Sequence, residues 1–162
     1  MYFLDLKNPL AAPYLLTNKH NASTPFYPHG ISMIKIDSAK YKIYAINHPD
    51  EKVHMIESFI LENGTLEIDS IFLDDKIFSP NDLVAIDEHR FYFTNDHKYV
   101  DGIGRLLEDY VGIGLSNVVY FDGEKYTEVA NGIGYANGIN YDSKRNLLFV
   151  ASPRNFLVKV YS

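Results

Sequence analysis

Similar strand openings recur along this chain at nearly equal spacing. The openings at His29, Asn81 and Asn137 each lead from a polar turn into an apolar run. Their starts lie 52 residues (29 to 81) and 56 residues (81 to 137) apart. A repeat of about 50 residues that holds about four short strands is typical of a β-propeller. An ordinary β-sandwich with chance similarities between its hairpins is the alternative, and the shared register of three copies favours the propeller.

The residues between these openings favour strands over helices. Short runs of Tyr, Phe, Ile and Val are separated by Gly, Asn, Asp and Pro, which end strands and form turns. Asn63-Gly64 stands between two such runs and predicts a tight hairpin turn. The predicted fold class is therefore all-β.

Residues 79–99 form the predicted hairpin that carries the most candidate metal-binding side chains. Asn81-Asp82 precedes its first strand, and Asn95-Asp96-His97 follows its second. Because both positions fall at one end of an antiparallel pair, we expect these side chains to converge. Their oxygen-rich character suits a hard cation such as calcium better than zinc.

Bulk properties exclude several function classes. The 162 residues carry a net charge of −6 without a run of Lys or Arg, which argues against nucleic acid as a partner. The absence of cysteine excludes disulfides and thiolate sites, and no apolar run reaches the roughly 20 residues of a membrane span. The first residues resemble a strand rather than a secretory leader. Glycosylation sequons begin at Asn21 and Asn63, but such triplets are common by chance, and Asn63 fits a turn better.

The repeat divides the chain into about three propeller blades. Residues 1–28 are expected to be the end of a preceding blade and a loop, 29–75 a blade, 76–130 a blade with an insertion, and 131–162 an incomplete blade. Propellers close with about four to eight blades. An open partial ring would leave sheet faces and edges exposed, so we expect either a fragment of a longer protein or closure with a second copy.

The insertion lies near residues 100–114. Leu106, Leu107, Tyr110 and Val111 recur at helical spacing, which predicts one short amphipathic helix. Its simplest role is to cover the sheet, and a lid or a lipid-contacting surface are the alternatives.

Five short motifs resemble those of the paraoxonase/arylesterase family, in its order and near its spacing, over residues 1–162. They are Pro28-His29-Gly30-Ile31-Ser32, Asn47-His48-Pro49, Pro80-Asn81-Asp82, Thr94-Asn95-Asp96-His97 and Ala136-Asn137-Gly138-Ile139-Asn140. The resemblance implies a six-bladed propeller with two calcium ions in its central tunnel. It also implies hydrolysis of aryl esters, lactones and, in some members, organophosphates, by a secreted or extracellular protein.

The resemblance assigns calcium ligands. Asn81 and Asn137 match side-chain ligands of the catalytic calcium. Asp82 matches a ligand of the structural calcium, to which Ile31 would offer its backbone carbonyl. The remaining family ligands, an acidic pair and an Asp-Asn pair, fall outside this segment, so the isolated chain is expected to bind calcium weakly and to turn over little substrate.

The resemblance also assigns residues around the reaction. His29 and His48 match a pair proposed as general base and proton shuttle. Asp96 and His97 match groups that support the site, and Tyr135 matches an aromatic wall residue. The helix near 100–114 looks like the family's canopy helix, which also meets lipid surfaces.

Other observations narrow the reaction class. The run from Gly114 to Asn117 lacks the Gly-x-Ser-x-Gly elbow of a serine hydrolase. His20, His54 and His89 stand in expected loops or turns, and the sequence assigns them no role. The leading hypothesis is a calcium-dependent hydrolase of aryl esters and lactones. A non-catalytic propeller fragment that binds partners is the alternative, and a relative of gluconolactonase-like propellers is a third reading.

Overall fold

The computed structural model describes residues 1–8, 10–18, 25–99, 102–104 and 114–162, and these residues form an all-β protein with four sheets. The all-β prediction is therefore confirmed. The helix predicted near 100–114 lies almost wholly outside the described residues, of which 102–104 form a single helical turn. Among the described residues there is no helix long and apolar enough to cross a membrane.

The first large sheet has the strand order β3-β7-β6-β5-β4. Its strands are β3 (Thr17–Asn18), β4 (Pro28–Lys35), β5 (Lys40–Asp50), β6 (Val53–Glu62) and β7 (Thr65–Phe72). The β6–β7 turn confirms the predicted Asn63-Gly64 hairpin, since both residues have positive φ (51° and 77°) and Glu62 pairs with Thr65. β5 runs through Asn47-His48 to Asp50, because the β5–β6 pairing extends to Asp50 and Val53.

The second sheet has the strand order β11-β10-β9-β8 and is antiparallel throughout. Its strands are β8 (Pro80–Ala85), β9 (Phe91–Asn95), β10 (Ser116–Phe121) and β11 (Tyr126–Ile133). Residues 100–101 and 105–113 fall between β9 and β10, so the insertion does not interrupt the sheet.

The third sheet has the strand order β12-β13-β14. Its strands are β12 (Ile139–Asp142), β13 (Leu147–Ser152) and β14 (Leu157–Tyr161), with a 3-10 helix η1 (Pro153–Asn155) between the last two. Near the N-terminus, β1 (Tyr2–Phe3) pairs with β2 (Tyr14–Leu15) as a separate two-stranded sheet.

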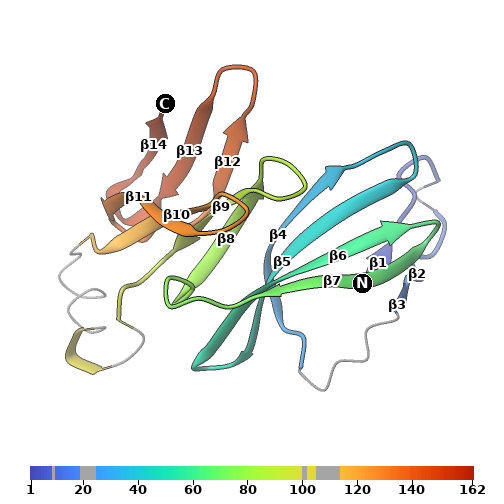
Figure 1. The fold of residues 1–162 in the computed structure, drawn as a ribbon, viewed down its shortest axis with the longest axis horizontal. Coiled ribbons are helices and arrows are strands. Elements are labelled where there is room, and N and C mark those ends of the chain that lie inside the picture. Colours follow the sequence, from blue (N-terminus) through green and yellow to red (C-terminus); the bar gives the residue numbers. More distant parts are fainter. Residues whose placement is uncertain (9, 19–24, 100–101, 105–113) are drawn as a thin grey trace.

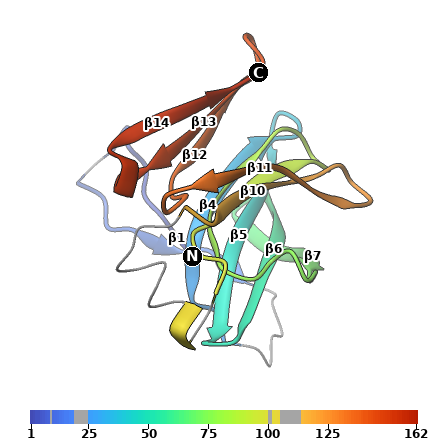
Figure 2. The same ribbon diagram turned by 90° about the vertical axis from the view of Figure 1, so that its left-hand side faces the viewer.

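β8 lies against both β4 and β12; these three strands, each at one edge of its large sheet, are here called the three first strands. A backbone N–H of β8, that of Ala85, donates to Ser32 Oγ of β4 at 3.1 Å, and that of Ile139 in β12 donates to Asp82 Oδ2 of β8 at 2.9 Å. In Figure 1, β8 lies between the sheet that contains β4 and the sheet that contains β12, and Figure 2 shows the third sheet, β12 to β14, set apart from the first. Sheets that meet through their first strands are consistent with a propeller segment, and the number of blades stays a prediction.

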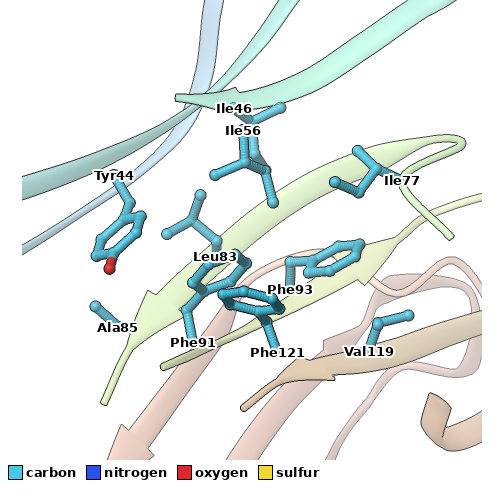
Figure 3. Packing of buried hydrophobic residues seen from close by; sticks show 10 residues of the cluster. All are labelled: Tyr44, Ile46, Ile56, Ile77, Leu83, Ala85, Phe91, Phe93, Val119 and Phe121. Carbon is cyan, nitrogen blue, oxygen red and sulfur yellow. The ribbon is translucent and has the colours of Figure 1, made fainter. Parts of the chain in front are cut away.

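The largest core cluster packs the first sheet against the second (Figure 3). Phe91 lies at its centre, fully buried, with its ring centroid 5.1 Å from both Tyr44 and Phe121. A second cluster around Val118, Ile139 and Val150 joins the second sheet to the third. This burial holds the three first strands together, and so sets the positions of the polar residues at their ends.

Candidate functional site

The β8–β9 hairpin brings its polar ends together as the sequence predicts. Asn81 Nδ2 donates to Asp96 Oδ2 at 3.1 Å, and Pro80 pairs with Asn95. An irregularity in the register between Pro80 and Leu83 lies at the start of β8, at Asn81-Asp82. Asn81 is buried, and its amide nitrogen is committed to Asp96 while its amide oxygen stays available as a ligand.

Asp96 is the centre of this cluster. Its carboxylate accepts hydrogen bonds from Ser79 Oγ and Asn81 Nδ2, and it lies 2.8 Å from His97 Nδ1. Burial alone would raise the pKa of Asp96, but the hydrogen bonds from Ser79, His97 and Asn81 outweigh it and hold the pKa below its usual value. Asp96 is therefore an anion at neutral pH, in the interior of the site.

A row of three histidines lies beside this anion. His29 Nδ1 lies 3.3 Å from His48 Nε2, and His48 Nδ1 lies 2.8 Å from His54 Nδ1. The structure thus brings the predicted pair, His29 and His48, within hydrogen-bonding distance. The expectation for His54 is wrong: it stands in β6 rather than in a polar loop, and it contacts His48 directly.

The pKa of His48 is lowered to about 4, by burial first and then by the charges of His54 and His29 when these are protonated. Asp96 and the carbonyl of Pro80 act in the opposite direction without restoring it. Burial also lowers the pKa of His54, against the opposing charges of Asp96 and Asp50. Both rings are therefore neutral at neutral pH, and each carries one N–H and one lone pair.

Asp82 connects the three first strands. Its Oδ1 accepts from Leu83 N and its Oδ2 from Ile139 N, both at 2.9 Å. A Cβ on Gly30 would lie 2.7 Å from Asp82 Cα and 2.8 Å from the Asn81 carbonyl oxygen, so only glycine allows β4 to approach β8 here. Thr94 Oγ1 lies between the peptides of residues 82 and 137, accepting from Asp82 N at 3.1 Å and donating to Asn137 O at 2.9 Å.

The other predicted residues lie around this core of contacts. Ile31 follows Gly30 in β4, pairs with Ala45, and has a side chain that is 55% exposed. His97 is buried and its ring packs edge-on against Tyr135, with centroids 5.0 Å apart. Tyr135 has a positive φ of 61° and also contacts the Arg154 guanidinium at 5.3 Å. Tyr135 therefore packs against the His97 ring in this structure.

The side chains at the starts of β8 and β12 offer oxygen donors of the kind that calcium binds. The amide oxygen of Asn81 and the carboxylate of Asp82 are hard donors, and each Asp82 oxygen has a lone pair beyond the hydrogen bond it accepts. Asn137 joins them through the Thr94 bridge, which holds its peptide beside that of Asp82. In the described part of the chain, no three His, Asp or Glu side chains form a metal-binding group. The donor set fits calcium in kind and supplies part of a site.

Sequence reasoning missed several residues that build this region. Ser79 and Thr94 tie the ends of β8 and β9 together, and His54 extends the histidine pair. The spacing of His54 from His48 was a usable signal. The two residues are six apart on either side of a tight β5–β6 connection, and such positions lie opposite each other in an antiparallel pair. Ser79 and Thr94 offer no comparable signal, since Ser and Thr are common at strand ends.

Comparison with known proteins identifies the family of this chain. The sequence matches the arylesterase family over residues 1–162. It is 35% identical to serum paraoxonase/arylesterase 2 of Gallus gallus over 156 residues, which cover 93% of this chain and 43% of the relative. It is 31% identical to serum paraoxonase/arylesterase 1 of Mus musculus over 160 residues, which cover 98% of this chain and 45% of the relative. The chain thus spans less than half the length of these relatives, and it belongs to the arylesterase family.

Proposed function

We propose that the full-length protein is a calcium-dependent hydrolase of aryl esters and lactones. The observation that carries this proposal is the convergence on the anionic Asp96 of the Asn81 amide, which donates to it, and of His48 and His54, on which its charge acts. Arylesterase is the activity named in the matching family and in the relatives.

The chain's own residues have distinct tasks in this proposal. His29 is exposed and faces incoming substrate and water, while His48 lies behind it and can exchange a proton with it at 3.3 Å. The negative charge of Asp96 favours a transient positive charge on His48, and so helps the pair to accept a proton from an attacking water. Bound calcium would supply Lewis-acid polarisation of the substrate carbonyl.

Asn81 and Asn137 are the proposed side-chain ligands of the catalytic calcium, and Asp82 and the Ile31 carbonyl the ligands of a second, structural calcium. Asp96 holds the amide nitrogen of Asn81 at 3.1 Å and thereby orients its oxygen. Tyr135 and His97 form a wall beside this group. Because the described residues supply few ligands for each ion, we expect the isolated 162 residues to bind calcium weakly and to turn over little substrate.

Two further parts of the proposal concern the location of the protein and its contact with lipid. The serum paraoxonase relatives suggest an extracellular location, which we carry over to this protein. Contact with lipid was predicted through the helix near 100–114, and that segment lies outside the described residues apart from 102–104 and 114.

The test uses purified full-length protein with phenyl acetate and a simple lactone as substrates. Hydrolysis should be lost on chelation of calcium and restored by adding calcium. Replacement of Asn81 or Asn137 by Ala should lower kcat/KM by at least about 100-fold, as removal of an electrostatic group in the transition state does. Full activity in chelator would refute the metal role. Absence of hydrolysis in the calcium-loaded protein would instead favour a binding module.

A further inference from the structure

His54 contacts the proposed proton-transfer pair, but the proposed mechanism assigns it no role. It stands in β6, half-buried, and its Nδ1 lies 2.8 Å from Nδ1 of His48. The two rings are nearly perpendicular, with an interplanar angle of 84° and centroids 4.8 Å apart. This is the edge-to-edge geometry of a hydrogen bond between ring nitrogens rather than a stack.

A contact of this kind requires one proton between the two nitrogens. A neutral imidazole carries one N–H and one lone pair, so either His48 donates from Nδ1 or His54 does. This choice determines whether the other ring nitrogen of His48, Nε2, carries a proton or a lone pair. If Nδ1 of His48 carries the proton, its Nε2 presents a lone pair to His29 Nδ1, 3.3 Å away.

The direction of the hydrogen bonds along the three histidines also determines whether the exposed nitrogen of His29 is a donor or an acceptor. With the His48 lone pair facing it, His29 donates its Nδ1–H to His48, and the opposite nitrogen of the His29 ring is an acceptor on the exposed side. With the reverse direction, His29 would present an N–H there and could not take a proton from water. Only one tautomer of His48 therefore leaves the exposed ring ready to act as a base.

The surroundings keep the His48–His54 pair neutral. Burial lowers the pKa of both rings, while Asp96 faces both and Asp50 faces His54. The Pro80 carbonyl also lies near the His48 ring and acts against this lowering. Because both rings are uncharged, each carries a single N–H. One ring therefore donates the hydrogen bond between them and the other accepts it.

We propose that His54 is a positioning residue: it accepts the Nδ1–H of His48, fixes that tautomer, and so turns the Nε2 lone pair of His48 toward His29. The 2.8 Å contact between the two ring nitrogens is observed, and the assignment of His48 as its donor is part of the proposal. Its catalytic consequence rests on the proposed function, which assigns proton transfer to His29 and His48.

Two variants of the full-length protein separate position from packing. His54→Phe keeps a ring but removes the acceptor, and His54→Asn keeps an acceptor, since Oδ1 of Asn occupies nearly the place of Nδ1. His89→Phe is the matched control, because His89 lies in the β8–β9 turn with a side chain that is 74% exposed. Calcium-loaded protein is used throughout.

The first measurement is the tautomer of His48, from long-range proton–nitrogen NMR spectra of protein labelled with ¹⁵N-histidine. The wild type, His54→Asn and His89→Phe should show His48 protonated at Nδ1, and His54→Phe should shift it to the Nε2-protonated form. A wild type protonated at Nε2, or a His54→Phe variant still protonated at Nδ1, would overturn the proposal.

The second measurement is steady-state hydrolysis of phenyl acetate. His54→Phe should lower kcat by about 10- to 100-fold, the usual effect of losing a residue that orients a functional histidine, with KM nearly unchanged. His54→Asn should recover most of kcat. If the wild type hydrolyses nothing but the NMR result holds, the proposed function fails and the positioning role stands. If the wild type is active and His54→Phe matches it, the positioning role fails.

Discussion

Oδ2 of Asp82 accepts a hydrogen bond from the backbone N–H of Ile139 at 2.9 Å, which joins the first strand of the second sheet to the first strand of the third. The same carboxylate accepts from Leu83 N through Oδ1. Asp82, which the sequence suggests only as a calcium ligand, is thus also a tie between sheets. A loss of function on its replacement would mix the two roles unless stability is measured separately.

Replacing Asp82 by Ala should destabilise the fold even without calcium. Both partner amides belong to buried residues, and each unsatisfied group costs about 1–3 kcal/mol. Urea unfolding in the presence of EDTA should show a lower free energy of unfolding for Asp82→Ala. Asp82→Asn, which keeps one side-chain oxygen, should lose less. Equal stability of Asp82→Ala and wild type in EDTA would leave Asp82 with a role in ion binding only.

Replacing Gly30 by Ala should push β4 away from β8. The added Cβ would lie 2.7 Å from Asp82 Cα and 2.8 Å from the Asn81 carbonyl oxygen, and both are backbone atoms that cannot rotate away. Overpacking of this kind costs about 1–3 kcal/mol of unfolding free energy. Gly138→Ala is the control, since its Cβ would approach no atom closer than 3.8 Å. Thermal or urea unfolding of the two variants compares them directly, and indistinguishable stabilities would contradict the steric argument.

The ion pair between Lys42 and Asp69 should make stability depend on pH. Lys42 Nζ lies 2.9 Å from Asp69 Oδ2, and Ser58 Oγ donates to the same oxygen at 2.8 Å. Burial would raise the pKa of Asp69, but these partners lower it below 3.8, so its contribution to stability is present above pH 3.8 and is lost as pH falls through the lower folded-state value.

Asp69→Asn should therefore be less stable than wild type by about 1–3 kcal/mol at neutral pH, because a nearly buried ammonium loses its counter-charge. The difference should shrink as the pH falls below 3.8. Urea unfolding from neutral pH to about pH 3 measures it. Glu51→Gln, at an exposed side chain in the turn between β5 and β6, should match wild type at every pH. A difference for Asp69→Asn that stays constant with pH would rule out the ion pair as its cause.

His48 should remain neutral in the folded protein well below the range in which histidines usually titrate. Its pKa is lowered from 6.5 to about 4, so the unfolded chain takes up the proton first, and the contribution of His48 to the unfolding free energy declines as pH falls from 6.5 to about 4. The ring C–H resonances of His48 should shift with a midpoint of about 4 in an NMR titration. A midpoint near 6.5 would show that the ring is not desolvated as the fold indicates.

The sequence by itself determined the all-β class, the hairpin at Asn63-Gly64 and the convergence of Asn81 with Asp96. These are local consequences of turn chemistry and of antiparallel pairing, in which residues at one end of a hairpin must meet. The arylesterase family was also recognisable, because its motifs are short runs of adjacent residues.

Only the tertiary structure decided the contacts between sheets. The approach of Gly30 to Asp82 and the Thr94 bridge to Asn137 depend on how cores around Phe91 and Val118 set one sheet against the next. The pairing of His48 with His54 depends on the continuation of β5 and β6 to the Asp50–Val53 pair, which brings the two rings together. Such contacts join residues that no repeat or motif links, since packing of side chains far apart in sequence fixes the distances between them.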